Sequence, residues 1–204
     1  KKRYVMHILD DEGIKENKFK YTGVEVVRTT MPNAIKPYAK SIIETMLTTQ
    51  DLGKTNKIFN EAYETFKTLS PEEISFVMGI KGYEKHAVQC REWQTVKGMP
   101  VHAKSAYYYN QILEKLGTGN KYESISSSFP TRRSSDLTPN KYGLQSMGFK
   151  YEWPSEFNEL FKIDYEKMFD KILFQSIARF YDSVGWSIRK PSENVQTELF
   201  DLFA

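Results

Sequence analysis

Apolar residues recur every three to four positions in four stretches of this chain. The stretches cover residues 35–47, 58–69, 103–116 and 164–184. Such spacing gathers apolar side chains on one face of a helix, so we expect four helices, each with a buried face. Because the polar segment Asp51–Gly53 joins the first two, they should form a helical hairpin. Pro37 falls inside the first stretch, so that helix is either kinked in its first turn or starts late.

Other segments are rich in strand-forming residues. They are residues 3–9, 21–28 and 121–125. Asp10–Gly13 predicts a turn between the first two strands. His7 and the acids of this turn could suggest a metal site, but Asp-rich turns ending in Gly are common local chemistry, so we favour a solvated hairpin turn. Ser70–Glu73 predicts one helical turn, followed by an extended segment over Ile74–Ile80.

The composition is that of a folded domain, with 40% hydrophobic and 27% charged residues among 204. No apolar run approaches the length of a membrane span. The single cysteine, Cys90, excludes a disulfide framework and fits a reducing cytoplasm. The histidines and this cysteine are too widely spaced for a zinc site.

Charge is unevenly distributed along the chain. Residues 81–121 contain seven Lys or Arg against three Glu, and seven minus three leaves +4. The segment after Pro191 contains Glu193, Glu198 and Asp201 and no base. A basic middle and an acidic, apolar tail indicate two different partners.

The segment Gly98–Asn110 (G-M-P-V-H-A-K-S-A-Y-Y-Y-N) leads into the third predicted helix, which should end at Gly117. His102 and Lys104 would then lie at or near the helix N-terminus. Exposed amides and the positive end of the helix dipole suit an anion such as phosphate. The alternative is an ordinary helix start with solvated side chains.

Ser128–Leu137 (S-F-P-T-R-R-S-S-D-L) has the composition of a loop. Back-translated as TCT TTC CCT ACA CGA CGC TCT TCC GAT CT, it matches a widely used sequencing-adapter oligonucleotide. We hypothesise that this decapeptide is an assembly artefact inserted into a real reading frame; the alternative is a natural basic loop. The distinction matters because Arg132 and Arg133 would otherwise imitate a nucleic-acid-binding patch. Re-amplification of the source DNA tests the hypothesis, and recovery of the same codons would contradict it.

Motifs in the same order as in one known family run along the chain. Lys1-Lys2-Arg3-Tyr4 resembles the K-x-Y motif of family B DNA polymerases, and Gly98–Asn110 resembles a thumb motif of those enzymes. Ile163–Phe169, with Val184-Gly185-Trp186 closing its helix, is similar to the last thumb helix of the tailed-phage, T-even-like branch. Leu199–Phe203 resembles that branch's sliding-clamp tail. Ser128–Leu137 departs from the family pattern, which would continue a strand there.

The resemblance implies an α+β fragment: the end of the palm over residues 1–30, a mainly helical thumb with a small antiparallel sheet over 31–190, and a clamp-binding tail over 191–204. It also implies that the exonuclease, the fingers, the rest of the palm and the metal-binding aspartates lie upstream. The fragment would then have no catalytic residues. The intact protein would be a Mg²⁺-dependent DNA-directed DNA polymerase, a nucleotidyltransferase, in the cytoplasm of an infected bacterial host.

The resemblance implies two sets of contacts to primer–template duplex DNA. Lys1, Lys2 and Tyr4 would lie at the minor groove and backbone near the primer end. His102 and Lys104 would face the duplex backbone. Such contacts bind DNA without regard to sequence and depend strongly on salt.

The tail carries the spacing of a clamp-binding peptide. Gln196, Leu199, Leu202 and Phe203 fit Q-x-x-h-x-x-h-a, and Phe200 lies among them. The alternative is that this apolar segment folds back on the thumb. For the chain as a whole, the alternatives are a stand-alone, sequence-independent DNA-binding module and a structural interaction module.

Overall fold

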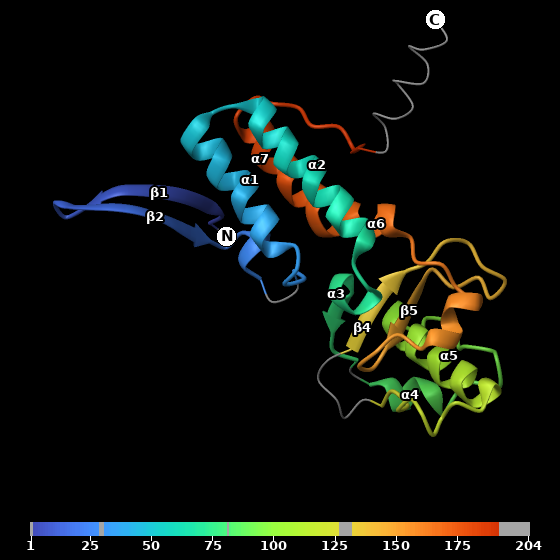
Figure 1. Ribbon diagram of the computed structural model, residues 1–204. Coiled ribbons are helices and arrows are strands. Elements are labelled where there is room, and N and C mark those ends of the chain that lie inside the picture. Colours follow the sequence, from blue (N-terminus) through green and yellow to red (C-terminus); the bar gives the residue numbers. More distant parts are fainter. Residues whose placement is uncertain (1, 29–30, 81, 127–131, 192–204) are drawn as a thin grey trace, which may run out of the picture. The chain divides into compact units, whose positions relative to one another are not determined.

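The computed structural model describes residues 2–28, 31–80, 82–126 and 132–191. The chain divides into two compact units: unit 1 comprises Lys1–Leu69 with Phe169–Ala204, and unit 2 comprises Ser70–Met168. Each unit combines helices with a small antiparallel sheet (Figure 1). The predicted α+β, mainly helical class is therefore confirmed. The expected palm–thumb boundary after residue 30 remains a prediction.

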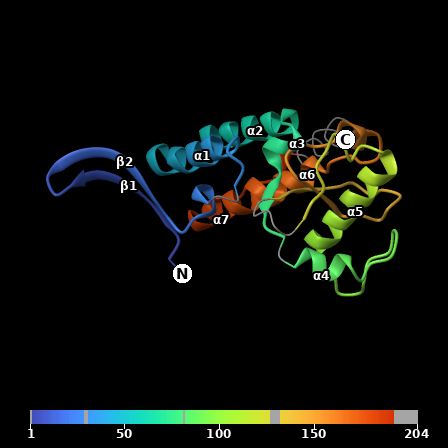
Figure 2. The same ribbon diagram turned by 90° about the horizontal axis from the view of Figure 1, so that it is seen from below.

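Unit 1 contains a two-stranded antiparallel hairpin, which extends away from the helices of the unit (Figures 1 and 2). Its strands are β1 (Tyr4–Asp11) and β2 (Ile14–Thr22). The Gly13 amide donates to the Asp10 carboxylate at 2.8 Å across the turn. The predicted first strand and hairpin turn are confirmed.

The second strand lies earlier in the chain than the sequence predicts. We expected residues 21–28, but β2 ends at Thr22 and Glu25–Val27 forms a 3₁₀ turn, η1. Gly23, at φ 65°, separates the two. The prediction was wrong because β2 is mostly polar and exposed and so gives no strong apolar pattern, whereas the valine-rich segment enters the core as a turn.

The predicted helical hairpin is confirmed by α1 (Lys36–Thr49) and α2 (Leu52–Thr68), which pack against each other. Pro37 lies in the first turn of α1, so the helix starts late rather than being kinked. The Asp51 carboxylate caps α2 by accepting from the Lys54 amide at 3.0 Å.

The last predicted helix, residues 164–184, is also confirmed, with one irregular turn. It comprises α6 (Tyr165–Phe169), the π-helical turn η3 (Asp170–Phe174) and α7 (Gln175–Ser183). Gly185 ends it at φ 75°, as predicted. The division between the two units falls within this continuous helix, after Met168.

Aromatic rings at the end of α6 and on α2 form the centre of the unit 1 core. The Phe169 ring lies 5.4 Å from Phe59, 5.0 Å from Tyr63 and 5.4 Å from Phe66, measured between centroids. These residues come from the apolar stripes that predicted their helices. The helical periodicity therefore predicted the core of unit 1 as well as its helices.

Unit 2 is built on a three-stranded antiparallel sheet in the order β3-β4-β5. Its elements are α3 (Pro71–Ile74), β3 (Phe76–Met78), α4 (Tyr83–Ala87), α5 (Val101–Leu116), β4 (Arg132–Asp136), β5 (Ser146–Phe149) and the 3₁₀ turn η2 (Ser155–Glu159). The predicted turn over Ser70–Glu73, the extended segment after it and the helix ending at Gly117 are confirmed. The β5 strand was not predicted.

The segment predicted as a loop over 128–137 contains the central strand of this sheet. β4 pairs with β3 on one side and β5 on the other. The Ser135 hydroxyl is fully buried and hydrogen-bonds the Ser75 hydroxyl. Composition failed here because a strand paired on both edges gains its stability from its neighbours rather than from its own side chains. Whether the decapeptide derives from an adapter remains a hypothesis.

The strand predicted over 121–125 is absent, although this segment lies within the described residues. The Asn110 side chain takes the place of a strand partner. Its amide nitrogen donates to the Ile125 carbonyl at 2.9 Å, and its oxygen accepts from the Ile125 amide at 2.8 Å. Tyr122 is buried and donates to Glu156 at 2.9 Å. The segment is therefore held as an irregular, hydrogen-bonded loop.

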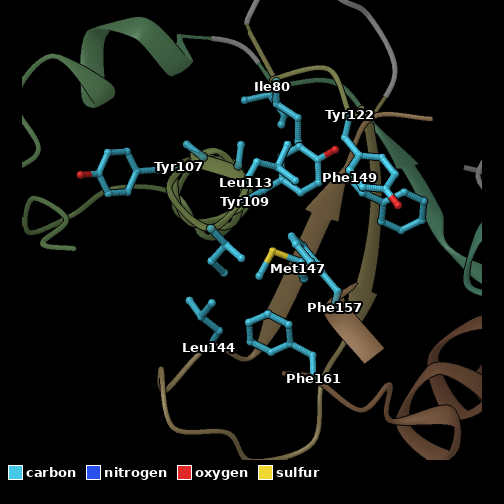
Figure 3. Close-up of a cluster of buried hydrophobic side chains, with 14 of the residues drawn as sticks. Ile80, Tyr107, Tyr109, Leu113, Tyr122, Leu144, Met147, Phe149, Phe157 and Phe161 are labelled. Carbon is cyan, nitrogen blue, oxygen red and sulfur yellow. The ribbon is translucent and has the colours of Figure 1, made fainter. Parts of the chain in front are cut away.

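The core of unit 2 lies between α5 and the sheet (Figure 3). Tyr109 and Leu113 point from α5 toward Met147 and Phe149 of β5, and these side chains are buried. Tyr107 points from the opposite side of α5 (Figure 3). The helix therefore has one face in the core and another available to loops and solvent.

Candidate nucleic-acid interface

The N-terminus of α5 is open, as the sequence predicts for an anion-binding helix start. Pro100 is the N-cap residue, and within the described chain no side chain caps this end. The first intrahelical bond joins the Lys104 amide to the Pro100 carbonyl at 2.9 Å. The amides of residues 101–103 precede that bond, so the positive end of the dipole is presented here.

The structure does not place His102 and Lys104 on one face. Residues two apart in a helix are rotated by about 200° around its axis, so their side chains diverge. By helical spacing, Lys104 falls opposite the face that carries Tyr109, whereas His102 falls on that buried face; both side chains are half-buried. We therefore expect His102 and Lys104 to face the same DNA backbone only if it passes the N-terminal end of α5.

Lys104 instead heads a polar stripe along α5. We call Lys104, Tyr108, Gln111 and Lys115, spaced by four, three and four residues, the α5 stripe. The Lys104 ammonium lies 5.8 Å from the centroid of the Tyr108 ring. Lys115 is exposed on the last turn. The stripe spans almost the whole helix, which rises by about 16 Å between its two lysines at 1.5 Å per residue.

A strained turn places an indole beside this stripe. The backbones of Arg91 and Gln94 hydrogen-bond each other in both directions, at 3.1 and 2.9 Å, which closes a tight turn with Trp93 near its tip. Trp93 adopts φ 59°, a region that costs a residue with a side chain about 1 kcal/mol or more. The Tyr108 hydroxyl donates to the Trp93 carbonyl at 3.2 Å and holds the turn against α5.

The same turn is fixed by a second tyrosine. The Tyr107 hydroxyl donates to the Arg91 carbonyl at 2.5 Å. Burial, and then the neighbouring Cys90, raise the pKa of Tyr107, so the phenol stays protonated as a donor at neutral pH. The turn is thus attached to α5 through two hydroxyl groups.

Three lysines lie over the aromatic rings of this surface. Lys115 lies 5.1 Å from the Trp93 ring, which stacks on Tyr142 at 5.8 Å and 19°. Lys141 lies 5.2 Å from the Tyr142 ring. Cation–π attraction positions each lysine ammonium group over its ring. The charged heads of Lys104, Lys115 and Lys141 therefore form a positioned basic surface.

Acidic residues limit the charge of this surface at one end. Glu92 and Glu114 line a pocket together with Trp93 and Lys115. The Gln111 amide lies 3.4 Å from the Glu114 carboxylate. The Lys104 end, which adjoins the open helix terminus, is therefore the more favourable end for an anion.

The other predicted DNA-binding residues belong to unit 1. Lys2 is exposed, and an ideal Cβ on Gly23 would lie 2.4 Å from its carbonyl oxygen, so the backbones approach closely there. Tyr4 is half-buried at the start of β1 and lines an apolar pocket. Lys1 lies outside the described residues, as do all the predicted clamp-binding residues: Gln196, Leu199, Phe200, Leu202 and Phe203.

Sequence reasoning missed most of this surface. Lys115 and Tyr108 could have been found, because they follow Lys104 at helical spacing. Trp93 and Tyr142 lie almost fifty residues apart in the sequence, and no local pattern joins them to α5. The structure also gives Asn110, the last residue of the thumb-like motif, a structural contact with Ile125.

Comparison with protein-family models and with curated proteins finds no match for this chain. Among the described residues, no group of three or more His, Cys, Asp or Glu side chains could hold a metal ion. Over the same part of the chain, no helix is both long and apolar enough to cross a membrane.

Proposed function

We propose that this chain is the duplex-gripping thumb part of a family B DNA polymerase that works in the cytoplasm of an infected bacterial host. The observation that carries the proposal is the α5 stripe. Its first lysine lies beside an uncapped helix N-terminus, and the motif around it resembles the thumb of that family. An open helix end and aligned lysines attract phosphates without reading bases, as a polymerase thumb requires.

Chemistry in the intact enzyme would require the upstream domains. The resemblance assigns the metal-binding aspartates to the part of the family's sequence that precedes these motifs, so this chain would hold product DNA rather than transfer nucleotides. The family's Mg²⁺ would be bound by residues outside this sequence. The tail over 191–204 would bind a sliding clamp through Leu199, Leu202 and Phe203, tethering the enzyme to DNA.

A salt titration tests the duplex-binding role. Fluorescence anisotropy would measure binding of the full chain to labelled primer–template duplexes of several sequences. We expect affinity to be independent of sequence and to fall steeply with salt. Lys104→Ala and Lys115→Ala should each make the log–log salt slope shallower by up to about one unit.

Lys162→Ala supplies the matched control, because Lys162 is exposed in unit 2 but belongs to neither the stripe nor the aromatic surface. It should leave the slope unchanged. Equal effects of all three substitutions, or absence of binding at low salt, would contradict the proposal and favour a structural interaction module.

A tail deletion tests the clamp-binding role separately. In the full-length polymerase, removal of Gln196–Ala204 should abolish clamp-dependent processive synthesis while short primer extension persists. Apolar residues of this kind commonly contribute about 2 kcal/mol or more to binding. Loss of basal extension and thermal stability together would contradict the clamp-binding role.

A further inference from the structure

Unit 1 contains an apolar pocket of about 370 Å³, whose lining includes Tyr4 but no residue of the α5 stripe. It lies between the start of β1, η1, α1 and α7. Its apolar lining includes Ile43, Met46, Leu47, Phe180 and Val184. Leu47 and Val184 are 39% and 50% exposed, so the apolar surface continues outward from the pocket.

The charged groups at this pocket carry an excess of positive charge. Glu25 accepts from Arg3 at 3.1 Å, and it also lies 3.5 Å from Arg28 and 3.8 Å from Arg179. Three guanidinium groups share one carboxylate, but Arg28 does not line the pocket, so the lining itself carries two minus one, or +1. Arg3 and Arg179 line the pocket itself. An apolar pocket with unbalanced arginines suits an apolar ligand that carries carboxylates.

The chain's own C-terminal segment has this chemistry. Residues 192–204 include Leu199, Phe200, Leu202 and Phe203 together with Glu193, Glu198 and Asp201, and contain no Lys or Arg. The pattern Glu198-Leu-Phe-Asp-Leu-Phe places acids and apolar side chains next to each other. Its charge and its apolar character both complement the pocket.

The described end of the chain is directed back along α7. The Trp186 amide donates to the Tyr181 carbonyl at 2.9 Å, which closes the helix end with Gly185 in the left-handed region. Further on, Lys190 lies 2.8 Å from the Asp170 carboxylate. The chain therefore reverses after α7 and returns to the level of η3, the turn that precedes it.

The remaining length is sufficient to reach the pocket. From Asp170 to Val184, the far end of the pocket lining, the helix rises by about 21 Å. From Pro191 to Leu199 an extended chain spans about 26 Å. The apolar residues of the segment can therefore reach the pocket within the same molecule.

We propose that the segment Gln196–Ala204 docks intramolecularly in this unit 1 pocket, with its apolar side chains in the cavity and Glu198 or Asp201 near Arg3 and Arg179. The docked segment would compete with any external partner of the same residues. The docking is tested on the chain alone, without DNA or a clamp, so its outcome does not depend on the proposed function.

Disulfide cross-linking in the full chain tests the docking. In a Cys90→Ser background, Leu47→Cys with Leu202→Cys would report on the pocket rim. Lys57→Cys with Leu202→Cys is the control pair, because Lys57 is exposed on α2 and does not line the pocket. We expect a monomeric cross-link to form about tenfold faster in the first pair, because docking raises the effective concentration of the two thiols.

Charge variants separate docking from chance collisions. Arg179→Glu should slow the cross-link at the rim, and Arg179→Glu combined with Glu198→Arg should restore it. Equal rates for the two cysteine pairs would overturn the proposal. Disulfide-linked dimers as the main product would also overturn it, because the occupant would then be a second copy.

A measurement without engineered cysteines completes the test. Met46 lines the pocket and is buried, so its methyl NMR signal is a local probe. Deletion of residues 196–204 should shift this signal, and the corresponding free peptide should shift it back. An unchanged Met46 signal on deletion, with native thermal stability, would overturn the proposal.

Discussion

Unit 1 takes its core from helices whose apolar stripes are visible in the sequence, whereas unit 2 takes its core from one helix packed on strands that are far apart along the chain. In unit 1, Phe169 meets rings of α2 whose spacing predicted that helix. In unit 2, the sheet joins 76–78, 132–136 and 146–149. Local periodicity therefore specifies the first core, and pairing between distant segments specifies the second.

The largest expected effects come from removing the central ring of each core. Phe169→Ala in unit 1 and Phe157→Ala in unit 2 should each destabilise the protein by about 3–5 kcal/mol, the usual cost of deleting a buried phenyl ring. Phe157 lies 5.6 Å from Tyr109 and 5.7 Å from Phe161, so it is as central as Phe169.

Urea unfolding measures the total loss, and amide hydrogen exchange shows where it occurs. Each variant should lose protection mainly in its own unit. Equal loss of protection in both units would show that they unfold together. The two units would then differ in how their cores are packed but not in their stability.

Gly23 offers a smaller test of unit 1. Gly23→Ala should cost about 1–3 kcal/mol, because a left-handed backbone is strained by a side chain and the added Cβ would meet the Lys2 carbonyl oxygen. Gly13→Ala is the control, since Gly13 also has positive φ but has no atom near an added Cβ. Thermal melting compares the two, and equal losses would mean that the approach to Lys2 is not tight in solution.

The buried serine pair offers a test of the unit 2 sheet. Ser75→Ala should cost about 1–3 kcal/mol, because the buried Ser135 hydroxyl loses the hydroxyl that it contacts. Ser135→Ala should cost less, because Ser75 also hydrogen-bonds the Pro71 carbonyl. The double variant should recover part of the loss. Chemical denaturation measures all three, and strict additivity would show that the two hydroxyls do not interact.

The smallest expected effect is a dependence of unit 2 stability on pH. The Glu156 pKa is lowered to about 2 by its own backbone amide first, and then by Lys121 and Tyr122. A carboxylate with a lowered pKa stabilises the fold above its unfolded pKa of 4.5, and the contribution is lost as pH falls toward 2. Glu156→Gln should therefore make the midpoint of unfolding less dependent on pH between 4.5 and about 2.

Asp170 allows the same measurement in unit 1. Partial burial raises its pKa, but hydrogen bonds from Lys190 and Gln175 outweigh this, and the net pKa is lowered. Its contribution is also present above the ordinary Asp pKa and is lost on acidification. Asp170→Asn should reduce acid sensitivity in unit 1 only. If either variant keeps the pH dependence of the unmodified protein, the ion pair of the replaced carboxylate is solvated and does not stabilise the fold.

The four long helices could be predicted from the amino-acid sequence, because apolar residues at helical spacing form one face that packs into the core. The turn at Gly13 and the helix ends at Gly117 and Gly185 could also be predicted, because single residues set the backbone conformation there. At Pro37 the sequence left a kink and a late start open, and the structure shows the late start.

Pairing between distant segments, and not a local pattern, selects which polar and short segments become strands. β2 is charged and exposed, and β4 is polar, so neither has an apolar pattern, and both exist because partner strands satisfy their backbones. Residues 121–125 are rich in strand-forming residues but have no partner strand. The Asn110 side chain makes the hydrogen bonds to the Ile125 backbone instead. The candidate interface shows the same division. Lys104 could be predicted from a local motif. Trp93 and Tyr142 lie in this surface because their rings stack although the two residues are far apart in the sequence, and no local pattern predicts that contact.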